Sequence, residues 1–239
     1  MEKRAKVMLC LVCATAFTLA MSTTSRAQNV LADPGFEQEL SATNPNPNGV
    51  AGWANFGGTS FLTTPNAHSG TNVLLTPAGG GGYSVPGTYQ DFAASAGQLW
   101  TLSGWVYTPS TLVSNSNDFA ILQMTFYTGA PPNNYAGGTA VGPTVGVDVG
   151  TPIGPTPTTV PLSPGTWTFV SVSAISSNAG INHVNSMGAY LLDINADANA
   201  TFYFDDMSLT ETAVPEPSSI ILALTGLCGL AVFAKKRRV

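Results

Sequence analysis

The sequence predicts an all-β fold, a two-sheet sandwich followed by one short C-terminal transmembrane helix. Three observations predict it. Between Gln28 and Leu209 no segment sustains a 3.6-residue hydrophobic period for three turns. Short apolar stretches alternate there with turns rich in Gly, Thr, Ser, Asn and Pro, which is typical of strands joined by loops. The third observation is an apolar run at the end of the chain that is followed by four basic residues.

The chain begins with a predicted signal peptide over residues 1–27. Three basic residues precede an apolar run over 7–21, and Ser25-Arg26-Ala27 then places small residues around a cleavage site. We therefore expect cleavage after Ala27. The alternative is a retained membrane anchor, but an apolar run of about fifteen residues falls short of the ~20 residues that span a bilayer.

Strands are expected throughout the next segment, 28–212, and the best-marked one covers 100–107. Two sets of residues alternate along it: Trp100, Leu102 and Val106 against Thr101, Ser103, Trp105 and Tyr107. Alternation of this kind directs one face to a core and the other to solvent. Similar runs predict strands over 73–75, 119–127, 167–174, 189–194 and 201–209, and their spacing favours a two-sheet sandwich.

Two proline-rich stretches of this domain, 44–52 and 129–165, are predicted to be loops. Proline cannot donate a hydrogen bond to a sheet ladder, so most of the second stretch is expected to be an extended excursion. It leaves room for one short strand over 145–149. No internal repeat is visible, and 28–212 is therefore interpreted as one domain.

The last segment, 213–239, combines three features in order: Pro215-Glu216-Pro217, an apolar run over 220–234 and the basic cluster 235–238. Fifteen helical residues rise about 22 Å, close to the short limit of a spanning helix. The four cations would stay in the cytoplasm and leave the acidic domain outside. This order resembles the PEP-CTERM sorting signal. The resemblance implies recognition and cleavage near 215–217 by an exosortase-type transpeptidase in the membrane. A plain tail anchor is the alternative.

The distribution of charge excludes several functions. No Lys or Arg lies between Gln28 and Ala234, whereas residues 28–214 hold eleven carboxylates and a formal charge of −11. Such a surface cannot neutralise phosphates, so we expect no binding to nucleic acid or to anionic lipid. Catalysis that needs Lys or Arg is excluded as well. The exported domain also contains no cysteine, so no disulfide stabilises it.

Several short motifs follow one another through the domain as they do in a known family. They are Asn29-Val-Leu, Asp33-Pro-Gly-Phe-Glu37, Gly52-Trp53, His68-Ser-Gly70, Tyr89-Gln90, the run from Ala96 to Trp105, Gly165-Thr-Trp167 and the run from Thr201 to Leu209. Their succession is similar to that of the jelly-roll carbohydrate-binding modules of the galactose-binding-like superfamily. The resemblance implies a jelly-roll sandwich that binds carbohydrate.

Modules of this kind often hold a calcium ion where the first strand meets the last. The resemblance implies Glu37, Asp205 and Asp206 as its ligands, completed by backbone oxygens around Asp33 and 68–71. Three carboxylates in a domain without cations repel one another, and a divalent ion would relieve that repulsion. Strand alternation predicts that Asp205 and Asp206 point to opposite faces, so that at most one is a direct ligand. The alternative is a set of solvated carboxylates at a strand end.

Sugar binding needs flat aromatic surfaces with polar groups nearby. Trp105 and Tyr107 share a face with Ser103 and Thr101. We expect carbohydrate contacts from these two aromatic residues and from residues on neighbouring loops or strand ends, namely Tyr89, Gln90 and Tyr83. Each aromatic residue also suits a place in the core or at the rim, and Trp53 and Trp167 are interpreted as packing. The excess of negative charge favours a neutral or calcium-bridged glycan.

The expected function is that of an exported, non-catalytic surface or matrix protein that binds or organises extracellular polysaccharide. One alternative is a surface structural protein without specific glycan binding, and another is a glycoside hydrolase, since eleven carboxylates are available for an acid and base pair. Nucleophilic catalysis is not expected. The chain has two histidines, neither lies in a Gly-x-Ser-x-Gly motif, and His68-Ser69-Gly70 is interpreted as a turn.

Overall fold

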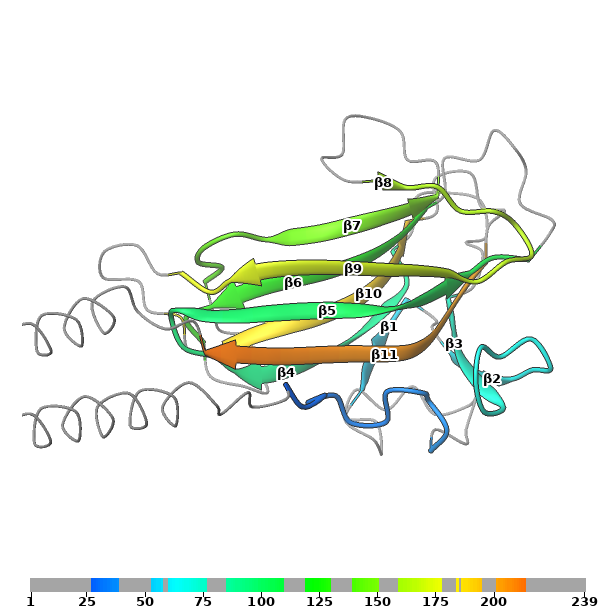
Figure 1. The fold of residues 1–239 in the computed structure, drawn as a ribbon, viewed down its shortest axis with the longest axis horizontal. Coiled ribbons are helices and arrows are strands. Elements are labelled where there is room, and N and C mark those ends of the chain that lie inside the picture. Colours follow the sequence, from blue (N-terminus) through cyan, green and yellow to red (C-terminus); the bar gives the residue numbers. More distant parts are fainter. Residues whose placement is uncertain are drawn as a thin grey trace, which may run out of the picture.

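The computed structural model describes residues 27–38, 53–57, 60–76, 85–109, 119–129, 139–150, 159–177, 184, 186–194 and 201–213. Its strands form two sheets that face each other (Figure 1). The six-stranded sheet has the order β1 (Ala54–Phe56), β4 (Gly87–Ala93), β10 (Ser186–Ile194), β6 (Phe119–Tyr127), β7 (Val145–Gly150) and β8 (Thr159–Val160). The five-stranded sheet has the order β2 (Ser60–Thr63), β3 (Asn72–Thr76), β11 (Phe202–Ala213), β5 (Gln98–Tyr107) and β9 (Thr168–Ile175).

The connectivity is that of a jelly roll. Four strands of each sheet form its framework: β3, β11, β5 and β9 on one side, and β4, β10, β6 and β7 on the other. The chain changes sheet at every step from β3 to β6 and again from β7 through β9 and β10 to β11, which produces the two interlocked Greek keys of this fold. All the pairings within this framework are antiparallel. The predicted all-β, two-sheet sandwich is thus confirmed.

The core lies between the sheets and is built by the period of two along each strand. In β5 the buried positions are Trp100, Leu102, Gly104 and Val106, and the residues between them are partly exposed. Facing strands contribute alternate residues in the same way, so that Leu74, Leu122, Met187 and Phe204 meet inside. All members of this core lie between Leu31 and Leu209, so the segment 28–213 contains both sheets and the whole core.

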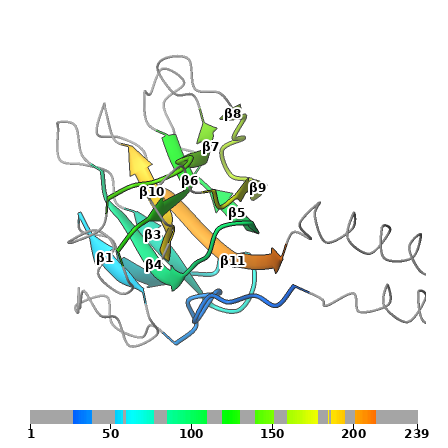
Figure 2. The same cartoon turned by 90° about the vertical axis from the view of Figure 1, so that its left-hand side faces the viewer.

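The segment 27–38 runs along one side of the sandwich, next to β11 and β4 (Figures 1 and 2). Val30 N–H donates to the carbonyl of Leu209 in β11. Gln90 of β4 holds the same segment from the other sheet, because its side chain donates to the Ala32 carbonyl at 2.7 Å and accepts from the Ala32 N–H at 3.0 Å. The segment therefore links the two sheets.

The predicted strands are each present, within five residues at either end, namely 73–75, 100–107, 119–127, 167–174, 189–194 and 201–209. The strand over 145–149 also forms, as β7. Four strands were not predicted, namely β1, β2, β4 and β8. The signal peptide, Tyr83 and the C-terminal motif and helix fall outside the described residues, apart from Ala27 and Ala213 at their edges. Within the described part of the chain, no helix is long and apolar enough to cross a membrane.

Candidate functional site

The outer face of the five-stranded sheet carries an aromatic cluster, which we define as His68, Trp105, Tyr107, Trp167, Phe169 and Tyr203. Pairing of β5 with its neighbours brings most of it together, since Trp105 lies opposite Phe169 of β9 and Tyr107 lies opposite Tyr203 of β11. Because all four residues have the parity that points away from the core, their rings meet on the outside. The predicted shared outer face of Trp105 and Tyr107 is therefore what the structure shows.

The rings of the cluster are in direct contact. Trp105 stacks on His68 with ring centroids 4.1 Å apart, and its other neighbour is Phe169, edge-on at 5.3 Å. Tyr107 lies between Trp167 at 5.2 Å and Tyr203 at 5.5 Å. Trp105 is thus held on both sides, whereas Phe169 leaves 53% of its surface exposed. Phe169 is the ring of the cluster that a ligand can reach most directly.

Rows of hydroxyl groups continue the same face beyond the cluster. One row runs across three strands through Thr210, Thr101 and Ser173, and the Thr101 and Ser173 hydroxyl oxygens are 2.8 Å apart. The next row joins Ser208, Ser103 and Ser171. No charged side chain belongs to either row. The face therefore presents aromatic rings at one end and an uncharged hydroxyl surface beside them.

The loop 64–71, which joins β2 to β3, lies against the cluster. Its Asn66 carbonyl accepts a hydrogen bond from the Trp167 indole at 3.0 Å, and His68 places its ring on Trp105. The turn itself is closed by a hydrogen bond from Thr64 N–H to the Thr71 carbonyl. Sequence reasoning interpreted His68 only as part of a turn and Trp167 only as packing. The structure assigns both to the outer cluster.

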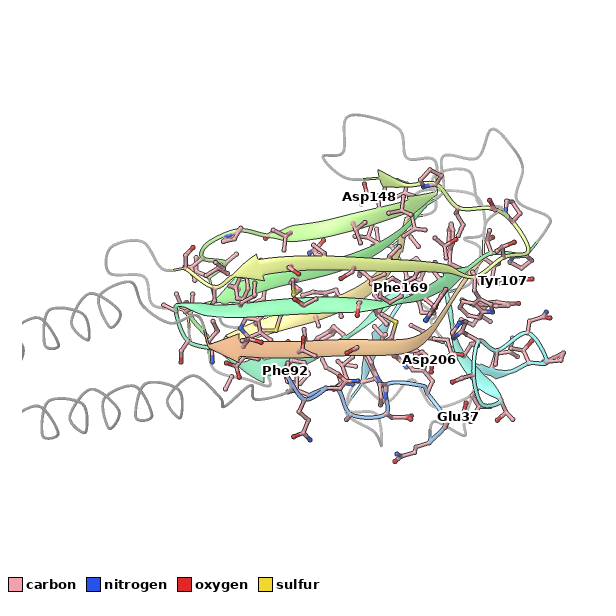
Figure 3. The ribbon with its side chains drawn as sticks, in the orientation of Figure 1. Glu37, Phe92, Tyr107, Asp148, Phe169 and Asp206 are labelled. Atoms are coloured by element: carbon pink, nitrogen blue, oxygen red, sulfur yellow. The ribbon has the colours of Figure 1, made fainter. Side chains whose placement is uncertain are left out.

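Three carboxylates hold this loop to the sheet, and we call the arrangement of Glu37, Asp205, Asp206 and the loop residues 68–72 the carboxylate clasp. Figure 3 shows Glu37 and Asp206 beside the β2–β3 hairpin, at the same end of the sandwich as Tyr107. Asp205 accepts from the N–H groups of His68 at 2.8 Å and Ser69 at 3.1 Å. Its second oxygen accepts from Asp206 N–H at 2.7 Å.

The other two carboxylates of the clasp take the remaining donors of the loop. Glu37 accepts from the N–H groups of Thr71 and Asn72 and from the Thr71 hydroxyl, at 2.8, 2.9 and 3.0 Å. Asp206 accepts from the Ser69 hydroxyl at 2.6 Å, and its other oxygen lies 2.6 Å from His68 Nδ1. Every carboxylate oxygen of the clasp therefore has a hydrogen-bond partner.

Unusual backbone geometry sets the direction of the carboxylate side chains of the clasp. Asp206 has a φ of 47°, and the register of β11 against β5 shifts between Asp205 and Ser208. This bulge corrects one prediction: the two aspartates do not point to opposite faces, because the extra residue turns Asp206 back toward the loop that Asp205 contacts. Asp33 and Phe36 also have positive φ, which bulky residues adopt at a cost, and both lie within the four residues before Glu37.

Gly70 has to be a glycine at this place. Its φ is 59°, and a Cβ atom there would lie within van der Waals overlap of the Glu37 carboxylate, 2.5 Å from its carboxyl carbon. The close approach of the loop backbone to Glu37 depends on the missing side chain.

Burial and hydrogen bonding move the pKa values of the clasp in opposite directions. Burial raises the pKa of Asp205 from 3.8 to about 6, the charge of Asp206 adds to the rise, and the three N–H donors act against it. Burial also raises the pKa of Glu37, but the Asn72 and Thr71 N–H groups and the Thr71 hydroxyl outweigh it. The pKa of Glu37 therefore lies below its usual 4.5.

We expect Asp205 to make the sandwich less stable as the pH rises. The folded state binds the Asp205 proton more tightly than the unfolded state, so the stabilisation is complete below pH 3.8 and is lost as the pH passes through about 6. The wild type is compared with Asp205→Asn across this range. The difference between their free energies of unfolding, wild type minus variant, should fall by up to about 3 kcal/mol from low to high pH. Urea unfolding of the segment 28–213 measures it. A difference that rises with pH would contradict the assignment.

The clasp supplies the hard oxygen donors that calcium prefers. Glu37 Oε1 and Asp205 Oδ2 each accept two hydrogen bonds, whereas the other four carboxylate oxygens have one partner each and keep a further lone pair for a metal ion. Within the described ranges, however, no group of three or more His, Cys, Asp or Glu side chains is arranged as a metal site. The donor chemistry fits calcium, and a ligand set is not already assembled.

Two further predicted site residues, Tyr89 and Gln90, do not join this face. Tyr89 lies in β4 on the outer face of the other sheet, where it stacks on Tyr190 at 5.3 Å. Gln90 is 5% exposed, and both ends of its side-chain amide are bonded to Ala32, which does not favour the expected ligand contact. Trp53, interpreted as packing, is fully buried and donates to the Asp33 carbonyl.

His68, Ser69 and Asp206 contact one another but are not a catalytic triad. In a triad the serine hydroxyl is bonded to the histidine. Here both Ser69 and His68 are bonded to Asp206, one through each carboxylate oxygen. Ser69 Oγ is therefore bonded to a carboxylate and not to the histidine that takes the serine proton in a triad.

The comparisons with known proteins bear on the C-terminus first. Residues 213–238 match the family model of the PEP-CTERM protein-sorting motif, which confirms the predicted sorting signal and contains Pro215, Glu216 and Pro217. This motif implies export and exosortase-mediated sorting to the cell surface. No curated protein matches the chain.

Solved structures resemble the sandwich at low sequence identity. A cyclase from Fischerella sp. TAU is 14% identical, and the match covers 80% of this chain and 100% of that chain with a TM-score of 0.50. An arabinose-bound α-L-arabinofuranosidase, MgGH51, is 15% identical over 77% of this chain and 26% of that chain, with a TM-score of 0.50. TmCBM61, solved in complex with β-1,4-galactotriose, is 14% identical over 78% of this chain and 100% of that chain, with a TM-score of 0.46. The first two matches support the fold alone.

Proposed function

We propose that this chain is an exported, non-catalytic surface protein whose sandwich binds neutral extracellular polysaccharide on the outer face of the five-stranded sheet. One observation supports it most: the half-exposed ring of Phe169 belongs to an aromatic cluster that lies beside two uncharged rows of hydroxyls. A sugar ring presents C–H faces that stack on aromatic rings and hydroxyls that exchange hydrogen bonds with such a surface. The likeness to a carbohydrate-binding module is consistent with this proposal.

The charge of the domain supports a neutral ligand. With eleven carboxylates and no Lys or Arg over 28–214, an acidic polysaccharide would be repelled. Within the described residues, the charges nearest the cluster belong to the clasp, where loop donors already compensate them. Binding through stacking and neutral hydrogen bonds should be almost insensitive to salt.

The geometry does not favour hydrolysis. Asp205 has the raised pKa that a general acid needs, but it is 0% exposed and its carboxylate accepts from backbone N–H groups. It therefore cannot deliver a proton to a glycosidic oxygen in a bound chain. Asp205 serves the loop rather than a substrate.

A panel of neutral and acidic polysaccharides, immobilised in native gels, tests the proposed function. The segment 28–213 should be retarded by at least one neutral polysaccharide and by none of the acidic ones, with little change when salt is added. Retardation by no polysaccharide would favour a structural surface protein instead. Release of reducing sugar from any of them would point to a glycoside hydrolase.

We also propose calcium at the carboxylate clasp, with Glu37 and at least one of Asp205 and Asp206 as ligands. The convergence of three carboxylates on one loop supports it. A bound ion would stabilise the folded state by mass action, so added calcium should raise the melting temperature of the segment 28–213 and a chelator should lower it. Glu37→Gln is expected to remove this response. An unchanged melting temperature in both conditions would overturn the calcium proposal and leave the hydrogen-bonded clasp intact.

A further inference from the structure

The longest sheet edge of the described structure is β9. Its eight residues pair with β5 on one side, and no described residue pairs with the other side. The other edge strands have two to four residues. An edge of this length carries a row of main-chain N–H and C=O groups that can pair with a further strand. Figure 1 shows β9 as the outermost strand of its sheet, beyond β5.

The alternation of hydrogen bonds tells which residues of β9 offer these groups. Ser176, one step past the end of β9, donates its N–H to the Gln98 carbonyl opposite. Residues of even number are therefore bonded to β5, and those of odd number turn their main-chain groups outward. The outward set is Phe169, Ser171, Ser173 and Ile175.

Side chains on this edge are apolar at both ends and uncharged throughout. Phe169 and Ile175 are 53% and 50% exposed, more than any other large hydrophobic side chain among the described residues. Both lie on the outer face, three residues to either side of Val172. Ser171 and Ser173 are symmetric about Val172 as well. Natural edges are usually protected by charge, proline or a bulge, and β9 shows none of these.

We propose that β9 is an interface between two copies of this chain, paired antiparallel about a two-fold axis at Val172. In this register Phe169 faces Ile175 of the second copy, and Ser171 faces Ser173. The outward main-chain groups then meet as hydrogen-bonded pairs, and the two five-stranded sheets become one continuous sheet. A C2 interface uses the same surface on both subunits, which the symmetry of β9 allows. An uncharged strand also lets two acidic domains approach with the least repulsion.

The dimer would place both aromatic clusters on the same face of one sheet. A two-fold axis perpendicular to a sheet keeps the outer faces on one side. If the proposed function holds, one long polysaccharide could then engage both copies, which raises the apparent affinity without a new contact. The pairing itself does not depend on carbohydrate binding.

Sedimentation velocity of the segment 28–213 tests the pairing. Two double variants are compared, which differ only in the sign of the charge at position 175. In Phe169→Lys/Ile175→Lys, like charges face each other twice across the interface. In Phe169→Lys/Ile175→Glu, opposite charges face each other at the same two places. Within one copy the two positions are about 20 Å apart and do not interact. The first variant should dimerise at least roughly tenfold more weakly than the second.

The wild type is expected to form a dimer that dissociates on dilution. A wild type that remains monomeric up to about 100 µM, or two double variants of equal dimer affinity, would overturn the proposal. Circular dichroism checks that both variants keep the β fold, and they share the Phe169→Lys change that removes the contact with Trp105. A wild type that stays monomeric but still binds carbohydrate at one site per chain would refute the pairing and leave the proposed function standing.

Discussion

Asp205→Ala is expected to lower the free energy of unfolding of the segment 28–213 by about 3 kcal/mol or more at neutral pH. The change leaves three main-chain donors, the N–H groups of His68, Ser69 and Asp206, without the acceptor that they share. A main-chain donor that water cannot reach costs about 1–3 kcal/mol when it loses its partner, and the loop is then held only through Asp206 and Glu37. Urea unfolding monitored by tryptophan fluorescence gives the value.

The matched control is Asp206→Asn. Asparagine tolerates the positive φ of this position, and the side chain of Asp206 is 33% exposed, so water can replace its partners. We expect a loss of less than about 1 kcal/mol. Equal losses from the two variants would mean that the loop is not held by the buried carboxylate, and the description of the clasp would be wrong.

Phe169→Ala is expected to weaken polysaccharide binding by roughly tenfold or more, because it removes the most exposed ring of the aromatic cluster. Its effect on the free energy of unfolding should stay below about 1 kcal/mol, since half of this ring is already in water. Affinity electrophoresis gives the first quantity and urea unfolding the second.

Ile175→Ala is the control for that experiment. Ile175 lies on the same strand and face and is almost as exposed, but it is remote from the cluster. Both changes weaken the same apolar contact of the proposed β9 interface, between Phe169 and Ile175 of the second copy. Any difference in polysaccharide affinity between the two variants therefore reports on the aromatic cluster. An equal loss of affinity in both variants would contradict a ligand contact at Phe169.

The long strands of the sandwich could be predicted because their alternation is unambiguous. β6 has the bounds expected from 119–127, and the alternation of 100–107 placed Trp105 and Tyr107 on the outside. β1, β2 and β8 were not predicted, because two to four residues are too short to show a period. β4 was missed for a different reason: its glycine and polar residues hide the alternation of Thr88 and Gln90, which point inward.

The candidate site was predicted only where it follows from strand parity. Phe169 could have been found, because it alternates with Ser171 and Ser173 in a predicted strand. Neither the bulge at Asp206 nor the position of His68 on Trp105 leaves a sequence signal, because both arise from contacts between segments that are distant in the sequence. The separation of Tyr89 from Trp105 likewise depends on which sheet each strand joins.

The most direct test of the central claim is to map where a neutral oligosaccharide binds. An isotope-labelled segment 28–213 is titrated with a fragment of the polysaccharide that retards it, and amide NMR shifts are recorded. Carbohydrate binding on the outer face of the five-stranded sheet predicts changes at Ser103, Phe169 and Ser171, with Tyr89 and Gln123 of the opposite sheet unaffected. Changes confined to Tyr89, Gln123 and their neighbours, or the absence of any change, would contradict it.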